Sequence, residues 1–195
     1  MDQEPFEDVC RRTGAEFDVD SGQFLVPALG GRLAVTPRTR QAEWIETSSG
    51  EAPGPASEVT RVAALTYLLS AQDVSREDEW IGPVELPSGD MFFRGVHSLP
   101  TADLEAAFGA STERFRAAAE ALGGTPLAFA DMAYRLPAFP HLAVAVLLWL
   151  GDDEFPARVR FLVDRFAGRQ LPLDGLLAVL SMVVEGLLHG GEGLR

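Results

Sequence analysis

The segment from Trp80 to Thr101 holds the residues best suited to chemistry, because it places a Trp, two adjacent Phe, an Arg and a His among Pro and Gly residues. A guanidinium group binds anions, aromatic rings offer stacking faces, and an imidazole donates hydrogen bonds or ligates a metal near neutral pH. This combination predicts a binding site for a ligand or a partner. Its candidate residues are Trp80, Glu85, Phe92, Phe93, Arg94 and His97.

A purely structural interpretation of the same residues is also open. The two phenylalanines would then point to opposite faces of a strand, Arg94 would pair with a carboxylate and His97 would fix a turn. No motif in the chain names a reaction, because the segment matches no nucleotide, metal or nucleophile signature.

Three further carboxylates, Asp152, Asp153 and Glu154, share one turn. They could bind Mg²⁺ or Ca²⁺ or supply acid–base groups, although they lack the alternating spacing of an EF-hand loop, and a solvated hairpin tip is the simpler interpretation. Together with His97 and Glu85 they define the competing hypothesis, an acid–base or metal-assisted enzyme. The three His residues lie more than 40 positions apart, so their spacing assigns no metal ligand, and we assign no catalytic residue.

Composition narrows the classes of function. The chain has 195 residues and a formal charge of −13, from 29 acids against 16 bases, so nucleic acid and anionic membrane surfaces are unfavourable partners. All of the bases are Arg, which rules out a P-loop lysine and Schiff-base chemistry. The one cysteine, Cys10, cannot form an intrachain disulfide or a cysteine-based cluster, and we expect a cytoplasmic protein. The longest apolar run, Leu142 to Leu150, has about half of the ~18 residues of a membrane-spanning helix.

Hydrophobic periodicity predicts the elements that must position these residues. A helix over 4–13 and strands near 16–19, 23–28 and 32–36 indicate a small N-terminal β-meander subdomain, residues 1–49. Residues 50–57 (GEAPGPAS) read as a linker, and 58–195 as the main domain.

The main domain combines both kinds of element. Its predicted helices are 58–72, one that Thr101 caps and Gly109 ends, 112–122 and 174–188, and its predicted strands are 129–136, 142–150 and 158–166. The links between the strands are too short for crossover helices, so the fold class is α+β, with a mostly antiparallel sheet covered by helices.

The last helix, 174–188, has an apolar face wider than one sheet layer covers. We therefore expect a homodimer or a partner contact through this helix if Leu177, Val184 or Leu188 is exposed.

Several short motifs occur in order along the chain: Tyr67-Leu68-Leu69, Trp80-Ile81-Gly82, Glu85-Leu86-Pro87-Ser88-Gly89, Phe92-Phe93-Arg94-Gly95, Leu148-Trp149, Gly151-Asp152-Asp153-Glu154-Phe155-Pro156 and Leu171-Pro172. In these motifs the chain resembles domain-of-unknown-function family 3786, a prokaryotic family without an assigned activity. Some relatives look associated with iron–sulfur or corrinoid proteins of anaerobic one-carbon metabolism. The resemblance thus implies a cofactor-linked accessory role. The cofactor itself is not assigned, but one narrower hypothesis combines the resemblance with the aromatic and His residues of the segment. In that hypothesis the protein binds a corrinoid or other tetrapyrrole, with His97 as its axial ligand.

These observations favour a non-catalytic cytoplasmic binding or accessory module. Its site lies around Trp80–His97, and it binds a small molecule or a protein partner.

Overall fold

The first five strands form one antiparallel sheet in sequential order. The computed structural model describes residues 6–47, 53–73 and 79–192. Helix α1 (Phe6–Thr13) precedes this sheet, whose strands are β1 (Glu16–Asp18), β2 (Gln23–Ala28), β3 (Gly31–Thr36), β4 (Gln41–Glu46) and β5 (Gly54–Pro55). The predicted meander is confirmed. The sequence pattern missed β4 and β5, which complete it.

A second antiparallel sheet has the order β6-β10-β9-β8-β7. Its strands are β6 (Trp80–Ile81), β7 (Thr125–Leu127), β8 (Met132–Phe139), β9 (Leu142–Trp149) and β10 (Arg158–Asp164). The apolar run of β9 lies at the centre of the sheet and is buried along almost its whole length, as a strand without polar side chains requires. Strand β8 continues through Pro137, which we had placed in a link. A register shift between Leu136 and Phe139 accommodates the missing N–H of the proline.

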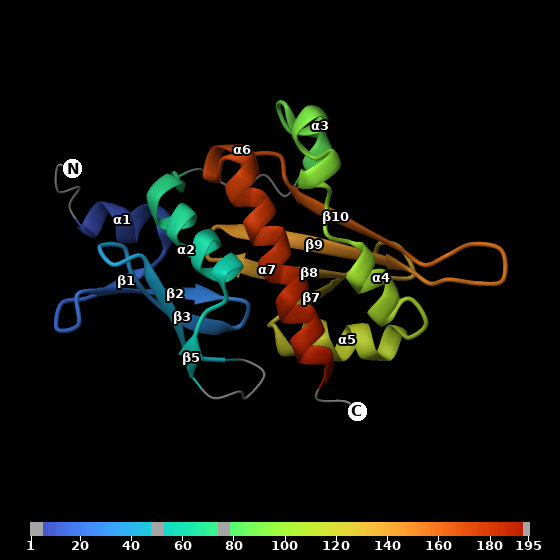
Figure 1. Ribbon diagram of the computed structural model, residues 1–195, viewed down its shortest axis with the longest axis horizontal. Coiled ribbons are helices and arrows are strands. Elements are labelled where there is room, and N and C mark those ends of the chain that lie inside the picture. The colour runs from blue at the N-terminus through green and yellow to red at the C-terminus, as the bar shows by residue number, and fades with distance from the viewer. Residues whose placement is uncertain (1–5, 48–52, 74–78, 193–195) are drawn as a thin grey trace.

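The larger helices cover one face of this second sheet (Figure 1). They are α2 (Glu58–Ser70), α4 (Ala102–Phe108), α5 (Thr112–Ala121) and α7 (Leu173–Glu192), and short helices occur at α3 (Gly89–Phe92) and α6 (Ala167–Gln170). Two 3₁₀ turns, η1 (Pro83–Glu85) and η2 (Gly95–His97), flank α3. The predicted α+β class is confirmed.

Helix α7 packs between α2 and α5, so a second layer of helices buries most of its wide apolar face. Val184 is buried, and Leu177 and Leu188 are half-buried. Because Leu177 and Leu188 keep part of their surface in water, a homodimer or partner contact through 174–188 stays a prediction. Within the described ranges, no helix is both long and apolar enough to cross a membrane.

The opposite face of the second sheet carries its own small apolar cluster. Its members all come from the strands of this sheet: Ala133, Ala145 and Leu147, with Trp80, Leu127, Trp149 and Leu162 packed against them. We call this surface the helix-free face. The apolar strand β9 is thus covered by helices on one side and by neighbouring strand side chains on the other.

The two sheets share one main core. Buried apolar residues of both belong to a single cluster, and the backbone N–H of Leu29 donates to the Pro137 carbonyl at 2.9 Å. A Cβ on Gly30 would lie 3.0 Å from the Leu122 carbonyl carbon, so glycine permits this close approach. The division into residues 1–49, 50–57 and 58–195 stays a prediction, and residues 48–52 lie outside the described part of the chain.

Candidate functional site

The candidate segment begins at the edge of the second sheet and then leaves it. Strand β6 pairs with β10, with Trp80 opposite Asp164, and the chain continues through η1, α3 and η2. Figure 1 shows α3 standing clear of the helices and strands beside it. We call residues Gly82–His97 the protruding segment.

Local hydrogen bonds and one close contact hold the protruding segment together. The Glu85 carboxylate accepts a hydrogen bond from the backbone N–H of Gly82 at 2.8 Å, which closes the 3₁₀ turn. A Cβ on Gly89 would lie 2.3 Å from the Pro83 carbonyl oxygen, so α3 packs directly on η1. Glu85 therefore caps its own turn.

The aromatic residues of the segment form one continuous stack. The Phe92 ring lies parallel to the His97 imidazole, with centroids 4.5 Å apart, and meets the Phe93 ring edge-on at 5.1 Å. Phe93 is buried in the core, Phe92 is half-buried and His97 is exposed. The stack therefore anchors the exposed end of the segment to the protein interior.

The interpretation in which the two rings point to opposite faces of a strand is wrong. Phe92 ends the short helix α3, and Phe93 is the residue that follows it. Arg94 is exposed and lies 3.9 Å from the Asp90 carboxylate, a distance typical of a weak surface ion pair.

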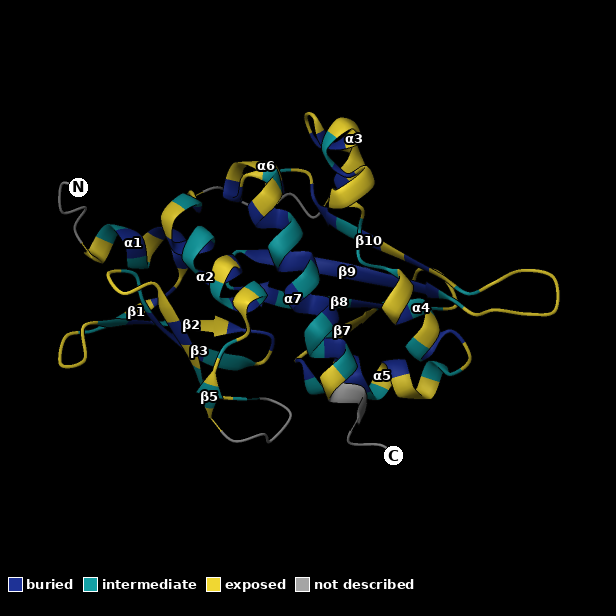
Figure 2. Cartoon of the chain, in the orientation of Figure 1, coloured by how far each residue is buried: buried dark blue, intermediate teal, exposed yellow. Residues whose placement is uncertain are grey.

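Apolar side chains project from the same segment into solvent. Met91 is 78% exposed, Val96 is 93% exposed and Val84 is also exposed. Figure 2 shows exposed residues gathered around α3 and along the loop between β9 and β10. Trp80 takes no part in this surface, because its ring packs on the helix-free face.

The acidic turn of Asp152, Asp153 and Glu154 lies in the exposed loop between β9 and β10. The Asp152 carboxylate accepts hydrogen bonds from the backbone N–H groups of Phe155 and Glu154, and these bonds lower the pKa of Asp152. In the described part of the chain, His97 has no hydrogen bond or ion pair with Glu85 or with these acids. Among the described residues, no group of three or more His, Cys, Asp or Glu side chains could hold a metal ion.

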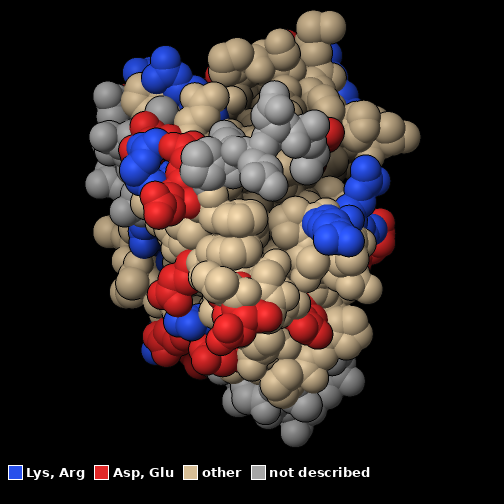
Figure 3. All heavy atoms as spheres, turned by 90° about the vertical axis from the view of Figure 1, so that its left-hand side faces the viewer, with Lys and Arg blue, Asp and Glu red and all other residues tan. Residues whose placement is uncertain are grey.

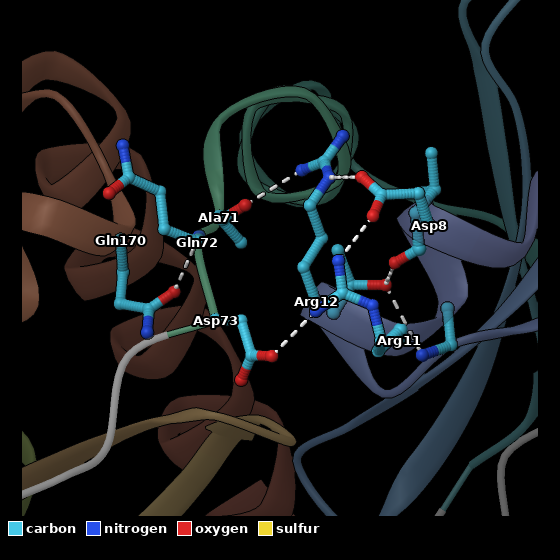
Figure 4. A network of polar contacts seen from close by, with 10 residues as sticks. Asp8, Arg11, Arg12, Ala71, Gln72, Asp73 and Gln170 are labelled. Carbon is cyan, nitrogen blue, oxygen red and sulfur yellow. Dashed lines mark hydrogen bonds and ion pairs between the residues drawn. The ribbon is translucent and has the colours of Figure 1, made fainter. Parts of the chain in front are cut away.

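A polar network that the sequence did not reveal joins α1 to the end of α2 (Figure 4). The buried Arg12 donates from Nη1 to the Ala71 carbonyl at 2.7 Å, and Arg11 donates to the Asp73 carboxylate at 2.7 Å. Beside it, the backbone N–H of Gln72 donates to Gln170 Oε1 at 3.2 Å. The network fixes α1 against the main body.

A shallow pocket of about 500 Å³ lies between α5 and the hairpin of β7 and β8. Its lining includes Arg116, Glu120, Phe129, Asp131 and Tyr134. The Tyr134 hydroxyl donates to Glu120 at 2.9 Å, and burial, followed by this hydrogen bond, raises the pKa of Tyr134. Sequence patterns missed this pocket because Phe129 and Asp131 read as the start of a strand, whereas β8 begins at Met132.

Comparison with known proteins gives a family but no activity. The family model described as "Domain of unknown function (DUF3786)" matches residues 5–186. No curated protein and no solved structure matches the chain. Because the family model covers nearly the whole chain, including the protruding segment and both sheets, this protein belongs to the DUF3786 family.

Proposed function

We propose that this protein is a non-catalytic binding module whose protruding segment docks on a partner protein. One observation carries the proposal: Met91 and Val96 are almost fully exposed on a segment that the Phe92–His97 stack ties to the core. Clustered apolar side chains in water are typical of interaction sites, and Met and aromatic residues are enriched there. The flexible thioether of Met91 fits an apolar pocket on the partner.

A protein partner fits this geometry better than a small molecule does. Small-molecule sites are concave and bury most of their ligand, whereas residues 94–98 are all exposed. The tetrapyrrole expectation, with His97 as axial ligand, gains no support for the same reason, because such a ring system needs apolar walls on its faces. It stays a prediction from the family resemblance and from the types of residue in the segment.

The enzyme alternative has less support than the binding module. General acid–base catalysis needs the acid and the base within about 3 Å of the reacting groups, and the Glu85 carboxylate is already bonded to the Gly82 backbone. A cytoplasmic location remains part of the proposal. A homodimer through α7 stays a prediction, because Leu177 and Leu188 are only half-buried there.

The proposal is tested by adding charge to the exposed apolar residues. We expect affinity-tagged Met91→Glu/Val96→Glu to recover at least about tenfold less of its partners from natural host cells than the wild type, because a charge at an apolar contact costs well over 1 kcal/mol. The matched control is Val19→Glu/Leu69→Glu. It adds the same charge at two apolar residues that are also highly exposed but lie outside the protruding segment.

Circular dichroism should show the same fold for all three proteins, because every substituted side chain is exposed. Equal recovery of partners by the wild type and Met91→Glu/Val96→Glu would contradict the proposal, as would the absence of any partner of the wild type.

A further inference from the structure

The helix-free face presents a strip of partly exposed apolar side chains around the buried residues of β9. In the sheet register, Leu147 lies between Ala133 on β8 and Arg160 on β10, and Ala145 lies opposite Leu162. The small side chains of Ala133 and Ala145 are buried between larger neighbours, while Leu127 and Leu162 are only partly covered. Two layers normally enclose a sheet whose central strand is apolar on both faces, and the described chain supplies only one.

Two tryptophans mark the ends of this strip. Trp149 pairs with Arg158 at one end of β10, and Trp80 pairs with Asp164 at the other. Six residues of strand separate these positions, which corresponds to about 20 Å. An α-helix of about 13 residues has that length.

Basic residues on β10 flank this strip beside Trp149. Arg158 and Arg160 are exposed on the helix-free face, and neither has a hydrogen bond or ion pair within the described residues. They are unusual on a chain with a formal charge of −13. Figure 3 shows acidic side chains gathered instead on the lower part of the end that α1 and the first sheet form. An acidic group that approaches the helix-free face beside Trp149 therefore meets favourable local charge at these two arginines.

We infer that the helix-free face is a docking surface for an amphipathic helix of a partner protein, with acidic residues beside its apolar strip. The apolar side chains of such a helix pack on the partly exposed Leu127 and Leu162, between the two tryptophans. Its carboxylates reach Arg158 and Arg160. A second copy of this chain fits less well, because symmetric docking places the arginines of both copies in one interface. Single-stranded nucleic acid is opposed by the charge of the whole chain.

The test uses a fluorescently labelled synthetic helix of about 14 residues, with Leu and Ala on one face and Glu on its flanks. A second peptide carries Lys in place of every Glu. We expect fluorescence anisotropy to show binding of the acidic peptide and at least about tenfold weaker binding of the basic one. Arg158→Glu/Arg160→Glu should weaken binding of the acidic peptide by a similar factor.

The matched control is Arg38→Glu/Arg40→Glu, which makes the same change of charge at exposed residues of the first sheet's turn and should bind as the wild type does. Met91→Glu/Val96→Glu should also bind the acidic peptide as the wild type does. A negative result for the helix-free face can therefore be told apart from a negative result for the protruding segment. Any of three results would overturn the inference: no binding of the acidic peptide, equal binding of both peptides, or equal binding by Arg158→Glu/Arg160→Glu. The inference would also be overturned if light scattering showed a dimer, or if the protein bound RNA, and Arg158→Glu/Arg160→Glu abolished that association.

Discussion

Tyr67 is a buried residue whose ionisation the fold changes strongly. Its fully buried hydroxyl donates to the Thr13 carbonyl at 2.9 Å and accepts from the backbone N–H of His141 at 3.2 Å. Burial raises the pKa of Tyr67 to about 12, because an ionised phenolate would lose its hydration. One hydroxyl thus joins the end of α1 to the turn between β8 and β9.

The stability of the protein should therefore fall in alkali because of Tyr67. Between pH 10 and 12 the unfolded tyrosine loses its proton while the folded one keeps it, so the free energy of unfolding decreases, by about 2 kcal/mol at pH 11.5. Denaturant unfolding at pH 9 and pH 11.5 measures this loss. Tyr67→Phe should be about 1–3 kcal/mol less stable than the wild type at pH 9, because it leaves buried backbone groups without partners. The variant should then lose less on going to pH 11.5, and identical losses would assign the effect to other groups.

The residue types of the candidate site were predictable, but their arrangement was not. The sequence picked out Phe92, Phe93 and His97 as a group, and the structure stacks them together. It could not show which ring is buried, because that depends on Ser88, whose left-handed backbone turns the chain into α3 instead of a strand. Trp80 lies in the same stretch of sequence, yet strand pairing with β10 directs it to another surface.

At the scale of elements, local signals predicted best. The helix predicted over 58–72 is present as α2, and it begins after Ser57, which accepts a hydrogen bond from the Thr60 N–H at 3.1 Å. Thr101 was expected to do the same for α4, but its own backbone is helical and its side chain makes no cap. Strand β4 was missed because its stability comes from pairing with β3 and β5, which no local periodicity records.

The cap of α2 should contribute measurably to stability. Ser57 also donates to the Glu185 carboxylate on α7 at 2.6 Å, so it connects two packed helices. Ser57→Ala should lower the free energy of unfolding by about 1–2 kcal/mol in denaturant titrations. Ser57→Asn keeps an acceptor for the helix N–H groups and should retain most of that stability. Equal losses in the two variants would show that the cap itself contributes little.

At the scale of the whole molecule, the shared core predicts that both sheets unfold together. Trp44 packs against the main core from the first sheet, whereas Trp80 and Trp149 lie on the second. In Trp80→Phe/Trp149→Phe the fluorescence of the remaining Trp44 reports the unfolding of the first sheet. In Trp44→Phe the fluorescence of the other two tryptophans reports the unfolding of the second sheet. We expect each curve to coincide with the circular dichroism transition of the same variant, because separating the sheets would expose shared core surface.

The opposite outcome is also informative. If the Trp44 signal changes at a lower denaturant concentration than circular dichroism does, residues 1–49 unfold as a separate unit. The expected division at 50–57 would then describe a true boundary between domains.

The edge strands of the two sheets affect how readily the protein aggregates at high concentration. An apolar strand such as β9 could pair with its copy in another molecule and seed aggregates if it lay at an edge. Here every edge strand is short: β1 and β7 have three residues, and β5 and β6 have two. Pro55 and Pro126 also remove a backbone donor from two of these edges. The fold thus offers a neighbouring copy almost no backbone on which to build a further strand, and β9 stays shielded at the centre.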